Sequence, residues 1–209
     1  MLNKRGILIV VSGFSGAGKG TVMKRLMEKY GTSYALSVSM TTRGPRTGEV
    51  DGVHYFFVSR EQFEKTISEE GFIEHAQYCG NYYGTPRAYV EKQLAEGKNV
   101  ILEIEIQGAL LVKEKIPETL LLFVTPPSAQ ELKRRLVGRG TETMEEINAR
   151  LKRAIDEAPI MSQYDYIVLN DEVENCVDKI HELVDAAKHS TDRNRECIEM
   201  MKKELAELN

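Results

Sequence analysis

The chain has 209 residues, 42% of them hydrophobic, and a formal net charge of −4. This length can bury one sizeable core, and a slightly acidic chain has no bulk attraction for nucleic acid or anionic membranes. Three widely spaced cysteines without metal-ligand spacing are typical of reduced thiols, so we expect a cytoplasmic protein. No apolar run approaches the roughly 20 residues that cross a bilayer. Nucleic-acid and membrane partners are therefore not expected.

The first element is an apolar run that leads into a glycine-rich loop. ILIVV, residues 7–11, predicts a central parallel strand that is buried on both faces. VSGFSGAGKGT, residues 11–21, then matches the phosphate-binding pattern G-x-x-x-x-G-K, and helical spacing follows as far as Gly31. Loop amides and the helix N-terminus are expected to bind a nucleoside triphosphate through Gly13, Phe14, Ser15, Gly16, Ala17, Gly18, Lys19, Gly20 and Thr21.

One position of this loop departs from the usual pattern. Gly20 follows Lys19 where Ser or Thr normally holds Mg²⁺, and the hydroxyl comes one residue later at Thr21. Mg²⁺ would then be held by the triphosphate and by waters, several of which it usually keeps. Thr21 either helps through water or only stabilises the first helical turn. This GKGT form looks like that of nucleoside monophosphate kinases.

The remaining pattern alternates strands and helices. Strands are predicted at residues 34–39, 54–58, 72–78, 81–85, 99–105, 120–125 and 166–170, the last as a buried strand. Helix caps are predicted at Ser59, Thr85, Ser128 and Thr143, and a long charged helix ends the chain. We therefore predict an α/β fold with a doubly wound parallel sheet core, at residues 1–33 and 89–209. Residues 34–88 are predicted as an inserted lobe, and about 136–150 as a short lid.

Five arginines are placed to contact phosphates: Arg43, Arg46, Arg135, Arg139 and Arg150. The guanidinium fork matches phosphate oxygens, and transfer between two nucleotides gathers several phosphates at one place. Arg43 and Arg46 lie in a Gly/Pro-rich loop, so we expect both to be exposed. A GTPase would share the phosphate-binding loop, but its base-selecting strings N-K-x-D and T-K-x-D are absent. The sequence therefore favours a kinase.

Several blocks together resemble one family of phosphate-loop kinases. SGFSGAGKGT, SVSMTTRGPRTGEVDGVHYFFV, FIEHAQYCGNYYGT, ILEIEIQG, RLVGRGTET and YIVLND are similar, in order and spacing, to guanylate kinase over roughly residues 5–190. The resemblance implies a core sheet, a GMP-binding lobe and a lid. It also implies phosphorylation of GMP, and of dGMP, by ATP with Mg²⁺, an essential step in guanine nucleotide biosynthesis and salvage.

The same resemblance implies the roles of individual residues. Arg43 and Arg46 with Tyr55 and Tyr83 would hold the GMP phosphate, while Ser39, Glu74 and Thr85 would read guanine. Lys19, Arg43, Arg135, Arg139 and Arg150 would be catalytic, and Asn170 would lie near the adenine end of ATP. A carboxylate at Glu74 can accept both guanine N1–H and the exocyclic amine, whereas adenine lacks the N1–H.

The chain departs from the family pattern at two places. Glu103 and Glu105 stand where an Asp-x-Asp pair is common. The first acid is expected at the guanine site or its water network, and the second near the metal, which it and Thr21 would reach only through water. Phe14 stands where proline is common, and we expect it on the outer turn of the loop with little effect.

Two other functions stay open at this point. Guanylate-kinase-like domains of scaffold proteins bind phosphopeptides, but their phosphate loop is typically degraded, whereas Gly18 and Lys19 are intact here. A kinase for another nucleoside monophosphate is the second alternative, and Glu74 argues against it. The tail MMKKELAELN is expected to be a solvated helix, with self-association as the alternative, so the sequence leaves monomer or homo-oligomer undetermined.

Overall fold

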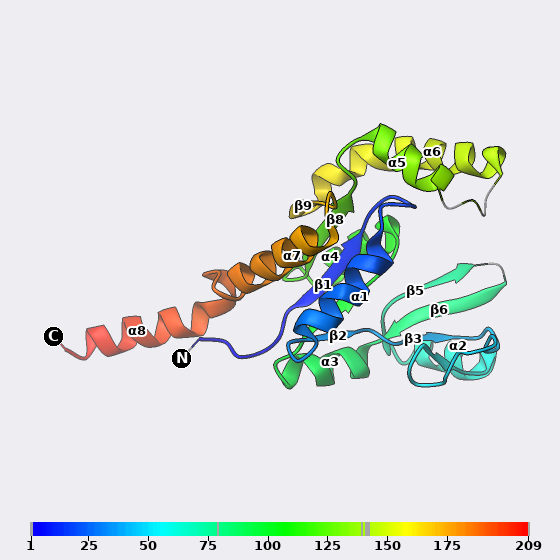
Figure 1. Ribbon diagram of the computed structural model, residues 1–209. Coiled ribbons are helices and arrows are strands. Elements are labelled where there is room, and N and C mark those ends of the chain that lie inside the picture. The colour runs from blue at the N-terminus through cyan, green and yellow to red at the C-terminus, as the bar shows by residue number, and fades with distance from the viewer. Residues whose placement is uncertain (1, 79, 139, 141–142, 209) are drawn as a thin grey trace.

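The structure is a computed structural model that describes residues 2–78, 80–138, 140 and 143–208. Its centre is a five-stranded sheet (Figure 1). In spatial order the strands are β2 (Tyr34–Leu36), β7 (Asn99–Leu102), β1 (Leu8–Ser12), β8 (Leu120–Thr125) and β9 (Tyr166–Leu169). Every neighbouring pair is parallel. The predicted α/β fold with a parallel core sheet is thus confirmed.

Helices cover both faces of this sheet because successive residues of a strand point to opposite sides. Ile9 and Val11 of β1 pack with one set of helices, and Leu8 and Val10 pack with the other. The first set is α1 (Lys19–Tyr30) and α7 (Val173–Lys188). The second is α3 (Arg87–Ala95), α4 (Ile106–Lys115), α5 (Ala129–Gly138) and α6 (Met144–Glu157).

The last strand, β9, is not the buried strand that the sequence predicts. Tyr166, Ile167 and Leu169 are 42%, 45% and 55% exposed, and only Val168 is buried. Strand β9 pairs with β8 alone and forms the edge of the sheet. An apolar run of four residues has the same appearance at an edge and at the centre, so its burial depends on its neighbours.

A second, mixed sheet forms the inserted lobe. Its order is β4 (Tyr55–Phe57), β3 (Ser39–Thr41), β6 (Asn81–Pro86) and β5 (Phe72–Tyr78). Helix α2 (Arg60–Ser68) packs on this sheet through Phe63, which is fully buried and stacks on Phe72 and Tyr82 with ring centroids 4.4 Å and 5.3 Å apart. The hairpin β5–β6 and the pair α5–α6 project from the same end of the core sheet (Figure 1).

The boundary between core and lobe differs from the predicted one at residue 34. The predicted strand 34–39 is divided: β2 pairs with β7 in the core sheet, whereas β3 begins at Ser39 and pairs with β4 and β6 in the lobe. Helix α3 begins at Arg87 and packs on the core through Val90 and Leu94. One apolar stretch therefore serves two sheets, which its hydrophobic pattern alone does not reveal.

Three of the four predicted helix caps are confirmed. The side chains of Ser59, Ser128 and Thr143 accept hydrogen bonds from backbone N–H groups three residues on, and Thr143 forms a complete capping box with Glu146. The prediction for Thr85 is wrong, since β6 continues to Pro86, which is the N-cap of α3. The Thr85 hydroxyl instead donates to Glu74 at 2.6 Å.

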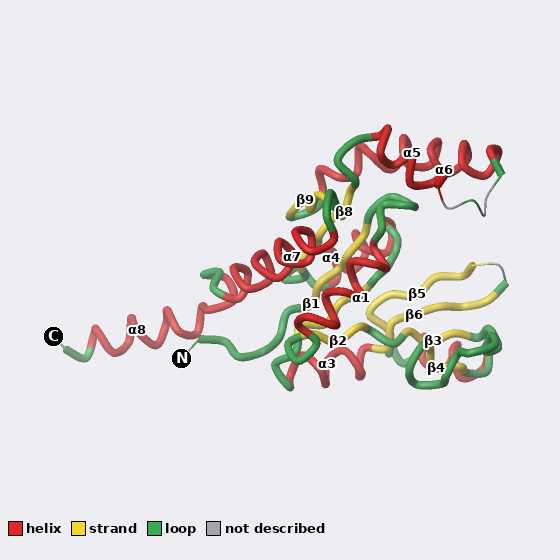
Figure 2. Tube along the Cα trace, in the orientation of Figure 1, coloured by secondary structure: helices red, strands yellow, loops and turns green. Residues whose placement is uncertain are grey.

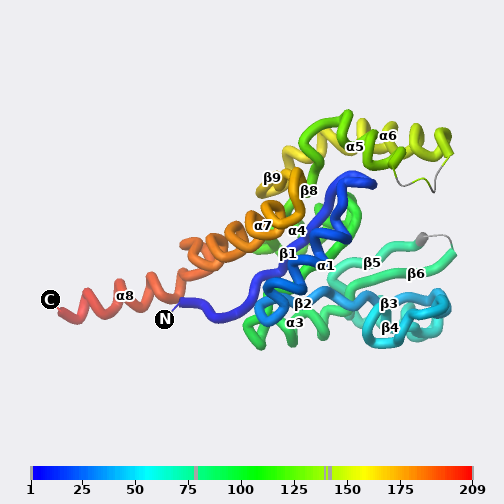
Figure 3. Tube along the Cα trace, viewed as in Figure 1, coloured from blue at the N-terminus to red at the C-terminus, as the bar shows by residue number. Residues whose placement is uncertain are grey.

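The chain ends in two helices rather than one. After α6 come the short helix η1 (Ala158–Gln163), β9 and α7; then η2 (Asp192–Asn194) leads into α8 (Arg195–Ala206). Figure 2 shows α8 as a separate helix that points away from the core. None of its residues is buried. Asn194 accepts a hydrogen bond from the Asn3 backbone at 3.0 Å, so the start of the chain lies beside the end of α7, as Figure 3 shows.

A close backbone approach at the start of β1 gives a stability prediction. A Cβ added at Gly6 would lie 1.8 Å from the carbonyl oxygen of Lys98. We expect Gly6→Ala to lower the free energy of unfolding by about 1–3 kcal/mol, because two backbone segments must separate. Chemical denaturation measures the change.

The matched control for this variant is Gly138→Ala, where no other described residue outside the surrounding helix backbone lies within 4 Å of the added Cβ. That variant is expected to change the free energy of unfolding by less than about 0.5 kcal/mol. Equal stabilities of the two variants would contradict the close approach at Gly6.

Candidate active site

The glycine-rich loop joins β1 to α1, as predicted. Gly16 and Gly18 have φ of 91° and 90°, in the left-handed region that glycine adopts without strain. A Cβ at Gly13 would lie 2.0 Å from the Val124 carbonyl oxygen of β8. The loop is thus pressed against the neighbouring strand, with its second half at the positive end of α1. This is the geometry that binds a phosphate group.

Lys19, at the start of α1, points back over the loop. Its ammonium group donates to the carbonyl oxygen of Gly13 at 2.7 Å and of Phe14 at 3.4 Å. The side chain therefore lies above the loop amides, where it can meet a bound phosphate. The pocket at this place is lined by Ser15, Gly16, Gly18, Lys19, Gly20, Thr21 and Glu103.

The two acids that follow β7 take different positions. Glu103 lines the pocket of the phosphate-binding loop together with Lys19 and Thr21. Glu105 precedes α4 and pairs with Arg153 of α6 at 2.7 Å. The sequence analysis expects Glu103 near guanine and Glu105 near the metal. The structure favours the reverse for the metal side, because Glu103 is the acid at the phosphate-binding loop.

Phe14 is also placed differently from the prediction. Its side chain is 8% exposed and belongs to the hydrophobic core, where it meets Phe123 edge-on with ring centroids 5.0 Å apart. The prediction of an outer-turn residue was therefore wrong. The aromatic ring anchors the loop to β8, and only its backbone remains available to a nucleotide.

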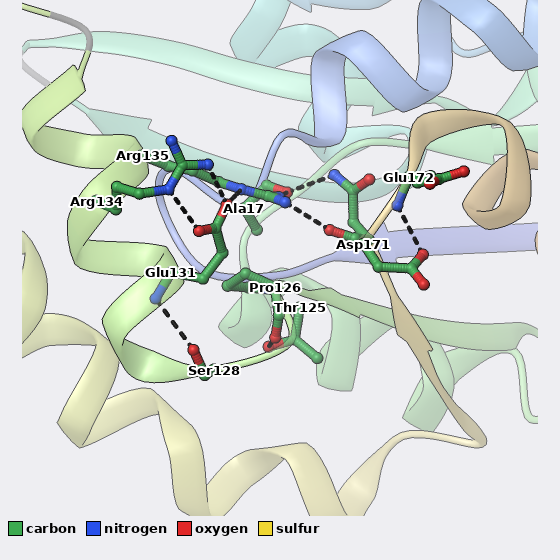
Figure 4. A network of polar contacts seen from close by, with 10 residues as sticks. Ala17, Thr125, Pro126, Ser128, Glu131, Arg134, Arg135, Asp171 and Glu172 are labelled. Atoms are coloured by element: carbon green, nitrogen blue, oxygen red, sulfur yellow. Dashed lines mark hydrogen bonds and ion pairs between the residues drawn. The ribbon is translucent and has the colours of Figure 1, made fainter.

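A polar network ties the loop to α5 and to the end of β9 (Figure 4). Arg135 donates to the carbonyl oxygens of Ala17 at 3.3 Å and Asn170 at 2.7 Å, and to Glu131 at 2.7 Å. The side-chain amide of Asn170, which is buried, donates to Ala17 at 2.7 Å. Hydrogen bonds from Arg134 and Arg135 lower the pKa of Glu131 to about 2, so this carboxylate is charged at neutral pH.

Of the other lid arginines predicted, Arg150 is also brought to the loop. It donates from α6 to the Ser15 hydroxyl at 2.5 Å. Arg139 lies outside the described residues, as do residues 141–142 of the predicted lid. Arg135 of α5, just before the predicted lid, and Arg150 at its end thus both lie beside the phosphate-binding loop.

The loop of the lobe that carries Arg43 and Arg46 is organised around an acid. Arg43 forms a two-pronged pair with Glu49, with N–O distances of 2.8 Å and 2.9 Å. Its side chain is only 15% exposed, so the expectation of an exposed Arg43 was wrong, whereas Arg46 is exposed. The Arg43 guanidinium lies 5.3 Å from the ring centroid of Tyr55, whose ring meets that of Tyr83 edge-on at 6.2 Å. Arg43, Tyr55 and Tyr83 thus lie close together in the lobe, and Arg46 lies in the same loop as Arg43.

The second polar feature of the lobe is a half-buried carboxylate. Glu74 of β5 accepts the Thr85 hydroxyl of β6, and burial raises its pKa, although Thr85, His75 and Lys115 act in the opposite direction. A Cβ at Gly108 of α4 would lie 3.9 Å from Glu74 Oε2, so Glu74 faces the first turns of α4. Ser39, also predicted for the base site, is half-buried in β3. A half-buried acceptor pair of this kind suits a ligand with two adjacent N–H donors.

The family model described as Guanylate kinase matches residues 5–187. The chain belongs to the guanylate kinase family.

Relatives and a solved structure agree with this assignment. A guanylate kinase of Clostridium perfringens strain SM101 is 54% identical over 194 residues, which cover 93% of this chain and 89% of the relative. One from Halalkalibacterium halodurans is 55% identical over 186 residues, 89% of this chain and 91% of the relative. The crystal structure of guanylate kinase from Anaplasma phagocytophilum superposes with a TM-score of 0.74 at 34% identity, covering 97% of this chain and 96% of that one.

Three residues around this guanylate kinase site were not identified from the sequence. Glu131 follows the predicted cap residue Ser128 by three positions, and its hydrogen bond from Arg135 is visible only in the structure. Glu49 belongs to the arginine-containing block, but its pairing with Arg43 is visible only in the folded loop. Arg153 resembles any charged residue of an exposed helix, and no signal in the sequence connects it to Glu105.

No helix in the described part of the chain is both long and apolar enough to cross a membrane. Among the same residues, no three His, Cys, Asp or Glu side chains gather into a metal site.

Proposed function

We propose that this chain transfers the terminal phosphoryl group of ATP to GMP, releasing ADP and GDP, and that dGMP is also accepted. The observation that carries the proposal is the pairing of two half-sites in one molecule. The phosphate-binding loop with Lys19 lies at the end of β1, and the lobe presents a half-buried acid, Glu74, beside Thr85. Family membership over residues 5–187 supports the same reaction.

The lobe would bind the acceptor nucleotide. The two carboxylate oxygens of Glu74 would accept hydrogen bonds from guanine N1–H and from the exocyclic amine, because a carboxylate has two acceptors and no donor. Thr85 and Ser39 would complete the base site. Arg43 and Arg46, with the hydroxyls of Tyr55 and Tyr83, would hold the phosphate and turn one of its oxygens toward ATP. The gain in the rate of transfer would come mostly from positioning, since phosphoryl transfer needs the two phosphates in line.

The core would bind the donor nucleotide. Amides of residues 13–20 would hold the β-phosphate, and Lys19 would follow the phosphoryl group as it moves. Arg135 and Arg150, already beside the loop, would stabilise the charge on the phosphate oxygens, and Arg139 is proposed for the same role. Asn170 is proposed for the adenine end. Closure of lobe and lid would exclude water and thereby hydrolysis.

The donor set at the loop is compatible with Mg²⁺. Glu103 and Thr21 line the pocket with Lys19, and one carboxylate with one hydroxyl suits a cation that keeps phosphate and water ligands. We therefore assign Glu103 rather than Glu105 to the metal side, with Thr21 acting through water. When bound, Mg²⁺ would neutralise charge on the phosphates. A cytoplasmic location remains part of the proposal.

A substrate panel tests this function. ADP release is followed in a coupled assay with GMP, dGMP, AMP, UMP and dTMP as acceptors. We expect GMP to give the highest kcat/KM, dGMP to be turned over, and AMP to be poorer by about 10³-fold or more, because it leaves the Glu74 carboxylate without its partners.

Other outcomes of the panel would contradict the proposal. Equal turnover of AMP and GMP would refute the role of Glu74, and a different preferred acceptor would indicate another nucleoside monophosphate kinase. If no acceptor stimulates ADP release while phosphopeptides bind to the lobe, the chain is a binding module instead.

A further inference from the structure

We propose that Glu49 is a positioning residue for the acceptor phosphate. Its carboxylate folds the loop of residues 43–49 around itself and fixes the Arg43 guanidinium before any nucleotide arrives. This inference rests on the proposed function, because it requires that Arg43 binds the phosphate of GMP. It adds that the affinity of Arg43 for that phosphate depends on an acid that does not itself contact the ligand.

The contact between the two side chains fixes orientation as well as distance. Nη1 and Nη2 of Arg43 donate to the two carboxylate oxygens of Glu49 at 2.8 Å and 2.9 Å, and Nη1 also donates to the Gly44 carbonyl oxygen at 2.8 Å. These bonds use three of the five N–H donors of a guanidinium. Two parallel bonds prevent rotation of the planar group, which a single bond would allow.

The surroundings of the pair are largely shielded from water. The side chains of Arg43 and Glu49 are 15% and 19% exposed. The guanidinium carbon lies 5.3 Å from the ring centroid of Tyr55 and 5.8 Å from that of Phe57. The pair raises the pKa of Arg43 and lowers that of Glu49 to about 2, so both groups are charged throughout the neutral range. In such a setting an ion pair is screened less than on an open surface.

Glu49 also holds the backbone that carries the second arginine. Its carboxylate accepts the Arg46 backbone N–H at 2.7 Å, and its own backbone N–H donates to the Arg46 carbonyl oxygen at 3.0 Å. Gly48 has φ of 88°, the conformation that the third residue of a type II turn requires. One carboxylate therefore sets the side chain of Arg43 and the backbone position of Arg46 together.

The negative charge of Glu49 gives opposite expected changes in GMP affinity for two possible roles of this residue. A carboxylate near a phosphate site repels the phosphate, so removing a mere bystander acid would strengthen GMP binding. A positioning acid has the opposite effect, because an unrestrained arginine must be ordered when the ligand binds. The sign of the change in GMP affinity therefore separates the two roles.

Calorimetric titration of GMP and guanosine into the full chain tests the inference. Guanosine lacks the phosphate, so the ratio of its Kd to that of GMP measures the contribution of the phosphate alone. We expect Glu49→Ala to lower this ratio about tenfold by loosening the Arg43 clamp, with guanosine and ATP affinities unchanged. Glu49→Gln keeps one oxygen acceptor and is expected to lower the ratio by a smaller factor.

Four outcomes decide between the alternatives. A lower ratio in Glu49→Ala, partly restored in Glu49→Gln, supports the inference. An unchanged or higher ratio in both variants overturns it, while a large loss in Arg43→Ala would still support the proposed phosphate site. If Arg43→Ala leaves the ratio unchanged, the proposed phosphate site is wrong. If Glu49→Ala does not fold, a ratio for Glu49→Gln equal to that of the wild type overturns the inference.

Discussion

Replacing Lys19 by alanine is expected to lower kcat by about a thousandfold while GMP still binds. The ammonium group lies over the loop, 2.7 Å from the Gly13 carbonyl oxygen, where it would meet the transferred phosphate in the proposed reaction. Alanine removes the charge at the point where negative charge moves during the reaction. The proposed GMP contacts come from the lobe, so the affinity for GMP should change by less than about twofold.

The matched control is Lys24→Ala, because Lys24 lies on the same helix and is exposed. Its kcat should equal that of the wild type. Steady-state kinetics and GMP titration on the three proteins check both statements. A folded Lys19→Ala protein that no longer binds GMP would show that the proposed division into donor and acceptor sites is incorrect.

Replacing Glu74 by glutamine is expected to lower kcat/KM for GMP by about a hundredfold and to reduce the preference for GMP over AMP. The carboxylate offers two acceptors to the two donors of guanine, whereas the amide offers one acceptor and one donor. The amide NH₂ would then face a guanine N–H. Measured kcat/KM values for GMP and AMP test the change, with the exposed Glu69→Gln as the control.

Stability distinguishes this loss of activity from misfolding. Burial raises the pKa of Glu74 in the folded protein, so its ionised form opposes folding. This cost is absent at a pH below the pKa of Glu74 in the unfolded chain. It is complete at a pH above the raised pKa of Glu74 in the folded protein. Glu74→Gln removes it, and we therefore expect a free energy of unfolding at neutral pH that is at least as high as in the wild type. A marked loss of stability would count against this interpretation.

The same pKa shift predicts how GMP binding depends on pH. In the proposed site guanine would bind the charged carboxylate of Glu74, whose pKa is raised above its usual value of 4.5. The affinity of the wild type for GMP should therefore decrease as the pH is lowered through that raised pKa. The weaker affinity of Glu74→Gln should remain constant over that window. Parallel pH profiles for the two proteins would exclude Glu74 as the titrating group.

Features that depend on neighbouring residues were predicted correctly from the sequence. The phosphate-binding loop needs only a strand, glycines and a helix in succession, and all three are present. The caps at Ser59, Ser128 and Thr143 close hydrogen bonds over three residues. The fourth cap failed because Glu74, a residue of another strand, takes the Thr85 hydroxyl. A local rule thus holds until a distant partner competes for the same atom.

The direction of a side chain was the property most often missed. The side chain of Phe14 packs in the core, edge-on against the ring of Phe123 of β8. Arg43 is half-buried because it pairs with Glu49 and lies against the ring of Tyr55. Strand β9 is exposed because it has a neighbour on one side only. None of these partners follows from the residues next to them in the chain.

By itself the sequence determined most of the elements, the phosphate-binding loop and the family, and it proposed the set of arginines. Each is encoded in residues that are adjacent or a few positions apart, where backbone geometry permits few alternatives. Only the tertiary structure decided that residues 34–39 serve two sheets, that Glu103 faces the loop while Glu105 pairs with Arg153, and that Glu49 holds Arg43. These features depend on packing between segments far apart in the chain, and such packing determines which charges share a site.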